Sequence, residues 1–124
     1  MVKRYVAESG SEIVRDAMAE AEEWYVCRAG FVDTVRAVGL AAGARATRAV
    51  EGEWPAFGVV EIDQPLAEHA AALALKHDLR SLDALHLAAA LMLPREALAF
   101  ATWDRRLHAA AAAERLTLLP VRLD

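Results

Sequence analysis

Short apolar segments alternate with longer segments of helical character along this chain, and this alternation strongly limits its possible folds. A parallel sheet needs a crossover connection, usually a helix, between consecutive strands. Aromatic and β-branched residues predict strands over residues 24–27, 58–62, 99–103 and 116–121. The sequence therefore predicts an α/β fold in which a largely parallel sheet is flanked by helices.

Capping residues mark several of the predicted helices. Ser9 and Glu12 have the S-x-x-E spacing of a capping box, which predicts a helix from there to about residue 21. Ser81 and Asp104 are expected to cap two later helices, over 81–94 and 104–113. Other helices are expected over 30–43 and 66–77, and the segment 45–54 is ambiguous, with a short helix ending before Pro55 as one interpretation.

The size and composition of the chain predict one domain in the cytoplasm. Its 124 residues, 56% of them hydrophobic, suit a single domain with a substantial core. The sequence contains neither an apolar run of about 18 residues, as a membrane span requires, nor an apolar secretory segment near its start. The single cysteine, Cys27, excludes an internal disulfide, fits a reducing cytosol and is expected to be buried.

Three aspartates are expected where helices follow strands or begin. Asp104 comes directly after a predicted strand, Asp33 lies in the first helical turn after another, and Asp83 lies in the first turn of its own helix. In open parallel sheets the active site lies beyond the carboxyl ends of the strands, so these acids can converge there. Clustered carboxylates repel one another unless a cation neutralises them, and their oxygens select Mg²⁺ or Mn²⁺. Such a pocket suits metal-assisted hydrolysis of phosphodiesters.

Each candidate also has a purely structural interpretation, which the spacing alone leaves open. Acids at helix N-termini are stabilised by about 0.3–1 kcal/mol without any metal. His86 follows Asp83 by one helical turn and is either a substrate contact or, as favoured, a hydrogen-bonded packing residue. The net charge of −4 does not suggest a general nucleic-acid coat, so phosphates need a local basic rim. Arg105 and Arg106 could form that rim or a solvated helix face.

Two segments carry a resemblance to a known family. The sequence LRSLDALHLAAAL over residues 79–91, followed by FATWDRRLHAAA over 100–111, resembles PIN-domain proteins, and most closely the VapC-type toxins of bacterial toxin–antitoxin pairs. The opening VKRYVAESGSE looks like the first helix of that family. The resemblance covers nearly the whole chain, and implies a single three-layer PIN-like domain over residues 1–124 with a parallel sheet of about five strands.

This resemblance implies a Mg²⁺-dependent endoribonuclease that cuts structured RNA such as tRNA or ribosomal RNA. It also implies neutralisation by a cognate VapB-like antitoxin and usually a homodimer. Asp83 matches the acid that opens the penultimate long helix, Asp104 the acid after the fourth strand, and Thr102 the hydroxyl that supports them. Asp33 falls where the family usually has a glutamate, or sometimes an aspartate, and its shorter side chain reaches less far. The implied reaction is direct attack of water, leaving a 5′-phosphate and a 3′-hydroxyl.

The start of the sequence departs from the family pattern. Family members normally begin with a hydrophobic central strand that ends in an aspartate, whereas Met1 here stands just before the V-K-R-Y helix. The expectation is that this strand and its aspartate are missing, through a start placed too far downstream or a degenerate form, and that metal binding and nuclease activity are weak.

Two other functions are alternatives to the nuclease interpretation of this sequence. One is a catalytically impaired PIN domain that acts by binding antitoxin or RNA. The other is a phosphoacceptor receiver domain, which needs a lysine after its last strand. The only lysines, Lys3 and Lys76, lie elsewhere, which argues against the receiver.

Overall fold

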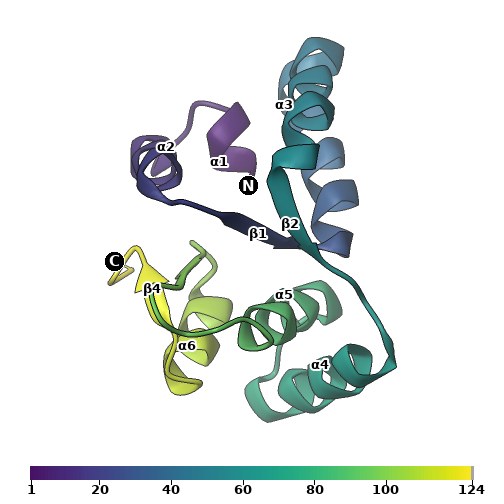
Figure 1. Ribbon diagram of the computed structural model, residues 1–124, viewed down its shortest axis with the longest axis vertical. Helices are drawn as coiled ribbons and strands as arrows, with labels where there is room; N and C mark the ends of the chain where they lie inside the picture. The colour runs from purple at the N-terminus through teal and green to yellow at the C-terminus, as the bar shows by residue number, and fades with distance from the viewer. Residues whose placement is uncertain (124) are drawn as a thin grey trace. The chain divides into compact units, whose positions relative to one another are not determined.

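The computed structural model describes residues 1–123, which form two compact units, one over Met1–Val60 and one beginning at Glu61. Figure 1 shows the elements of each unit in chain order. The first unit contains α1 (Val2–Tyr5), α2 (Ser11–Glu20), β1 (Trp24–Cys27), α3 (Arg28–Glu53), the 3₁₀ turn η1 (Trp54–Ala56) and β2 (Phe57–Val60). The second contains α4 (Gln64–His77), α5 (Ser81–Leu91), β3 (Ala99–Ala101), α6 (Arg105–Ala113) and β4 (Thr117–Leu119).

The strands pair in parallel, as the alternation of elements predicts. In the first unit Trp24 pairs with Phe57 and Cys27 with Val60, and α3 makes the crossover between the two strands. In the second unit Ala99 pairs with Thr117 and Ala101 with Leu119, with α6 as the crossover. The described strands thus form two two-stranded parallel sheets within a helix-rich α/β fold.

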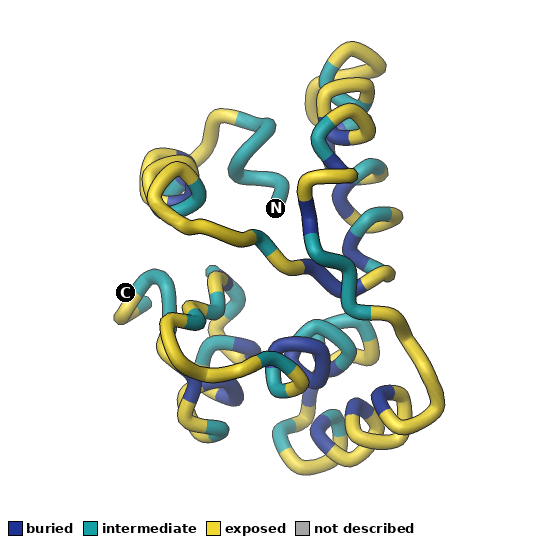
Figure 2. Tube along the Cα trace, viewed as in Figure 1, coloured by how far each residue is buried: buried dark blue, intermediate teal, exposed yellow. Residues whose placement is uncertain are grey.

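An aromatic and aliphatic core holds the first unit together. Val38 and Val50 of α3 are fully buried, and Trp54 packs against Phe57 with ring centroids 5.2 Å apart. Cys27 is only 2% exposed at the end of β1, which confirms the expected buried thiol. Strand β1 is therefore anchored by its last two residues, and buried segments of α3 and β2 face it in Figure 2.

A sharp bend divides α3 into two arms. Gly43 has φ +81° and ψ −172°, a left-handed conformation that side chains with a Cβ rarely adopt. A Cβ added to Gly39 would lie 3.0 Å from Cγ2 of Thr47, so the arms approach closely beside the bend. The helix expected to end near residue 43 is interrupted there by the bend at Gly43. The ambiguous segment 45–54 is mostly helical.

The predicted capping box is not formed. Helix α2 begins at Ser11 after Gly10, whose φ of +88° reverses the chain direction. The buried hydroxyl of Ser11 instead accepts a hydrogen bond from the N–H of Glu8 (2.9 Å) and donates one to the carbonyl of Val6 (2.9 Å). A glycine turn before the helix thus replaces the serine cap that the spacing predicted at Ser9.

The second unit is built on the packing of α4 against α5. The helix predicted over residues 66–77 is confirmed, and its apolar face is formed by Leu66, Ala70 and Leu73, which are all buried. On α5 the buried side chains are Leu87 and a series of alanines, whose small volume lets the helices lie close together. Figure 1 shows these two helices side by side. Over the described residues, none of the helices combines the length and apolar character needed to cross a bilayer.

Glu114 links the end of α6 to the end of α4. Its Oε2 lies 2.7 Å from Nζ of Lys76 and 2.7 Å from Nε2 of His77. The hydrogen bond from Lys76, then that from His77, lowers the pKa of Glu114 below its ordinary value. A carboxyl with a lowered pKa stabilises the folded state above its unfolded pKa, and this contribution is lost as pH falls through the folded pKa.

We therefore expect Glu114→Gln to lower the free energy of unfolding at pH 7 by about 0.5–1 kcal/mol. The deficit should shrink as the pH falls below the ordinary carboxyl range, because both states of the wild-type chain then bind the proton. Urea unfolding at pH 7 and pH 3 measures it. The exposed Glu68, whose Oε1 accepts a hydrogen bond from the side chain of Gln64, supplies the control variant Glu68→Gln. A Glu114→Gln deficit of equal size at both pH values would contradict the assignment.

Candidate active site

Asp104 sits at the junction between β3 and α6. It is the N-cap residue of α6, where its Oδ1 accepts the N–H of Leu107 at 2.9 Å, as the sequence predicts for a cap. The buried hydroxyl of Thr102 accepts the N–H of Asp104 at 3.2 Å, and the N–H of Thr102 donates to the carbonyl of Leu119 at 3.0 Å. Thr102 thereby fixes the turn, and Oδ2 of Asp104 is left to face other partners.

Asp83 lies in the first turn of α5, but the predicted cap of that helix is wrong. The N-cap residue is Arg80, with extended backbone at φ −65° and ψ 153°, and Ser81 is the first helical residue. No side chain caps α5, because the hydroxyl of Ser81 sits one position too late to do so. This shift places the side chain of Arg80 at the mouth of the helix, three residues before Asp83.

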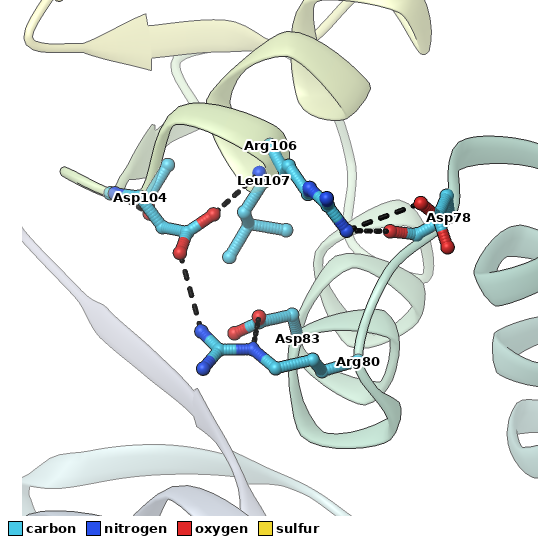
Figure 3. Close-up of polar contacts among 7 residues, drawn as sticks. Asp78, Arg80, Asp83, Asp104, Arg106 and Leu107 are labelled. Carbon is cyan, nitrogen blue, oxygen red and sulfur yellow. Dashed lines mark hydrogen bonds and ion pairs between the residues drawn. The ribbon is translucent and has the colours of Figure 1, made fainter.

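Arg80 joins the two carboxylates, as Figure 3 shows. Its Nε lies 3.1 Å from Oδ2 of Asp83, and its Nη2 lies 3.3 Å from Oδ2 of Asp104. The side chain of Arg80 is 76% exposed, whereas those of Asp83 and Asp104 are 17% and 37% exposed. Two acids from separate elements thus converge on one positive group at the surface.

Arg80, Asp83 and Asp104 line part of a pocket of about 520 Å³ in the second unit. Arg106 is held beside it by Asp78, with its Nη1 3.2 Å from Oδ2 and 3.3 Å from the backbone oxygen of that residue. The lining combines two acids, three arginines and two apolar residues: Leu79, Arg80, Asp83, Trp103, Asp104, Arg105 and Arg106. The pocket therefore offers carboxylate oxygens for a cation and guanidinium groups for an anion at the same place.

The structure brings some of the predicted site residues together and leaves others apart. The pocket is lined by Asp83 and Asp104 together with Arg105 and Arg106. The hydroxyl of Thr102 accepts a hydrogen bond from the backbone N–H of Asp104. His86 is half-buried on α5 and is not part of the lining. Asp33 is an exposed residue of α3 in the first unit, so its role as a ligand stays a prediction.

The donor set of the pocket fits a hard divalent cation. Mg²⁺ is commonly held by one or two carboxylates and completes its coordination with water and substrate phosphates. Asp83 and Asp104 supply two such carboxylates, and the guanidinium between them marks the place where positive charge is stabilised. Within residues 1–123, no three acidic, histidine or cysteine side chains lie close enough together to hold a metal ion. Asp83 and Asp104 are therefore the two carboxylates that the pocket itself offers to such an ion.

Arg80 is the functional candidate that sequence reasoning missed. Its signal was present, since an arginine three residues before an aspartate can reach it across a helical turn. With Ser81 as the cap, Arg80 lies outside the predicted helix, and its contact with Asp83 is not expected. Its second contact, with Asp104 at 24 positions along the chain, is a tertiary feature that no local pattern predicts.

A comparison with known families agrees with the α/β fold. The PIN domain family model matches residues 5–113, so the chain belongs to the PIN-domain family. It is also similar to Ribonuclease VapC45 of Mycobacterium tuberculosis (strain CDC 1551 / Oshkosh), with 43% identity over 81 residues. Ribonuclease VapC49 of M. tuberculosis (strain ATCC 25618 / H37Rv) matches with the same identity over the same length. These matches confirm the resemblance to VapC-type proteins. Each covers 65% of this chain and 56% of the relative, little more than half of its length.

Proposed function

We propose that this chain is a metal-dependent endoribonuclease of the toxin type, acting in the pocket between the N-termini of α5 and α6. The observation that carries the proposal is the convergence of Asp83 and Asp104 on the guanidinium of Arg80, in a pocket lined by arginines. The similarity to the two ribonucleases supports the reaction class. Mg²⁺ or Mn²⁺ is the proposed cofactor, since the site presents oxygen ligands.

Each residue has a defined part in this mechanism. Asp83 and Asp104 would hold the ion through their Oδ2 atoms, and Thr102 keeps Asp104 in place through its backbone. When bound, a divalent ion stabilises charge on the transferring phosphoryl group and makes water a stronger nucleophile. Arg105 and Arg106 lie on the pocket wall, where guanidinium groups can bind the flanking phosphates. The products would carry a 5′-phosphate and a 3′-hydroxyl, and Asp33 belongs to the ligand set by resemblance alone.

The proposed setting follows from the family. By resemblance to the family, the RNA would be structured, such as tRNA or ribosomal RNA, and its shape can supply specificity. The proposed partners are a cognate VapB-like antitoxin and a second copy of the chain in a homodimer, in the cytoplasm.

A second candidate function is supported by one specific observation. Only two acidic side chains gather at the pocket among the described residues, and an arginine stands between them. This arrangement favours weak metal binding and hence a PIN domain that acts by binding RNA or antitoxin.

An RNA cleavage assay separates the two. The chain is incubated with 5′-labelled tRNA and ribosomal RNA in Mg²⁺, in Mn²⁺ and in EDTA, and the product ends are mapped. The nuclease proposal expects discrete fragments with 5′-phosphates that appear only with metal. Retention of RNA in a mobility-shift assay with no fragments under any metal condition would favour the binding function and end the catalytic one.

A further inference from the structure

Arg80 occupies the position where a cation is needed by both carboxylates of the pocket. It contacts Oδ2 of Asp83 through Nε and Oδ2 of Asp104 through Nη2, so the same oxygens would face a bound metal ion. The remaining oxygen of Asp104 is committed to the backbone N–H of Leu107. A metal ion and the guanidinium of Arg80 therefore compete for the same ligand atoms.

The ion pairs of Arg80 with Asp83 and Asp104 can break readily. The side chain of Arg80 is 76% exposed, and exposed ion pairs are weak because water screens them. Its backbone is fixed independently, since its carbonyl accepts the N–H of Ala84 at 3.0 Å in the first turn of α5. The guanidinium can thus leave the carboxylates by rotation of the side chain alone, without any change in the fold.

A released guanidinium stays near the pocket, because Arg80 is one of its lining residues. Arginine is the side chain best suited to bind a phosphate, with two N–H groups directed at two oxygens. We propose that Arg80 exchanges partners during the reaction cycle: it neutralises Asp83 and Asp104 in the metal-free chain, and on metal binding it moves to a phosphate of the RNA. This inference rests on the proposed nuclease function and adds a substrate-binding residue to it.

Arg106 supplies the matched control for Arg80. Both arginines line the same pocket with similar exposure, 76% and 70%, but Arg106 pairs with Asp78, whereas Arg80 pairs with Asp83 and Asp104. Substituting either one by glutamine removes one positive charge from the pocket. Any difference between Arg80→Gln and Arg106→Gln therefore reports the contacts to Asp83 and Asp104, and not the general change in charge.

The first measurement is metal affinity without RNA. Mn²⁺ is titrated by calorimetry and followed by its paramagnetic signal in the wild-type chain, Arg80→Gln, Arg106→Gln and Asp83→Asn. We expect Arg80→Gln to bind Mn²⁺ about threefold to tenfold more tightly than Arg106→Gln, because two weak ion pairs no longer compete. Equal affinity in the two arginine variants would overturn the exchange. Mn²⁺ binding that is absent from the wild-type chain and both arginine variants, or unchanged by Asp83→Asn, would overturn the proposed metal site itself.

The second measurement is RNA affinity with and without metal. A fluorescent RNA hairpin is titrated by anisotropy in EDTA and in Ca²⁺, a hard cation with the same oxygen ligands. In Ca²⁺ we expect Arg80→Gln to bind the hairpin about fivefold to tenfold more weakly than wild type, and in EDTA within about twofold of it, because Arg80 is then held by the carboxylates. A loss of equal size in both conditions would show that Arg80 contacts RNA without exchanging partners, and would refute the proposal.

Discussion

Asp83→Asn is expected to lower metal-dependent RNA cleavage by about 100-fold or more while leaving the fold intact. The substitution keeps the size of the side chain and removes the charge that the proposed ion requires. Asp83 is not a cap, and its Oδ2 accepts a hydrogen bond from the exposed side chain of Arg80, so its exchange costs little stability. Initial rates of cleavage in Mg²⁺, with circular dichroism and thermal unfolding as a check on folding, measure the effect.

Asp63→Asn is the control for this experiment. Asp63 also lies at a helix start, where its Oδ1 accepts the N–H of Leu66 at 3.0 Å, and asparagine caps about as well. It does not line the pocket, so its variant should cleave RNA at the wild-type rate. Cleavage by Asp83→Asn within about threefold of wild type would remove Asp83 from the proposed mechanism.

Leu87→Ala should give the largest loss of stability among simple truncations in the second unit. Leu87 is fully buried in α5, and truncation leaves a cavity where the packed side chain stood. Such changes cost about 2–5 kcal/mol. Denaturant unfolding followed by circular dichroism measures the change, and Leu75→Ala on the neighbouring α4 is its control. Leu75 is 89% exposed, so its truncation should change stability by no more than about 0.5 kcal/mol. Equal effects of the two truncations would show that α5 is not packed as described.

Local patterns predicted most of the elements because each is specified by nearby residues. The strand at residues 24–27 and the cap at Asp104 depend on residue type within one turn, and both are as expected. The errors are also local. Ser9 and Ser81 have the right chemistry for caps, but Gly10 and the extended backbone of Arg80 set the helix starts elsewhere. Capping preferences of this kind contribute only about 1 kcal/mol, and the surrounding structure overrides them.

The candidate site was predictable in its residue types and not in its contacts. Asp83 and Asp104 are predicted from their positions at element ends, where parallel strands direct side chains to one edge, and Thr102 is predicted from the family resemblance. The link through Arg80 depends on the spacing between α5 and α6, which no local spacing encodes. The strand arrangement was likewise only partly foreseen, since the described strands form two separate pairs where one larger sheet was expected from the family resemblance.

The two carboxylate oxygens of Asp104 make different contacts, and this has a consequence for how this kind of protein can change over generations. One oxygen caps α6 and the other faces the guanidinium of Arg80, so under the proposed function the same carboxylate would serve both folding and chemistry. Asparagine keeps the cap and loses the charge. Under the proposed function, a lineage could therefore lose activity at this position and still produce a well-folded descendant.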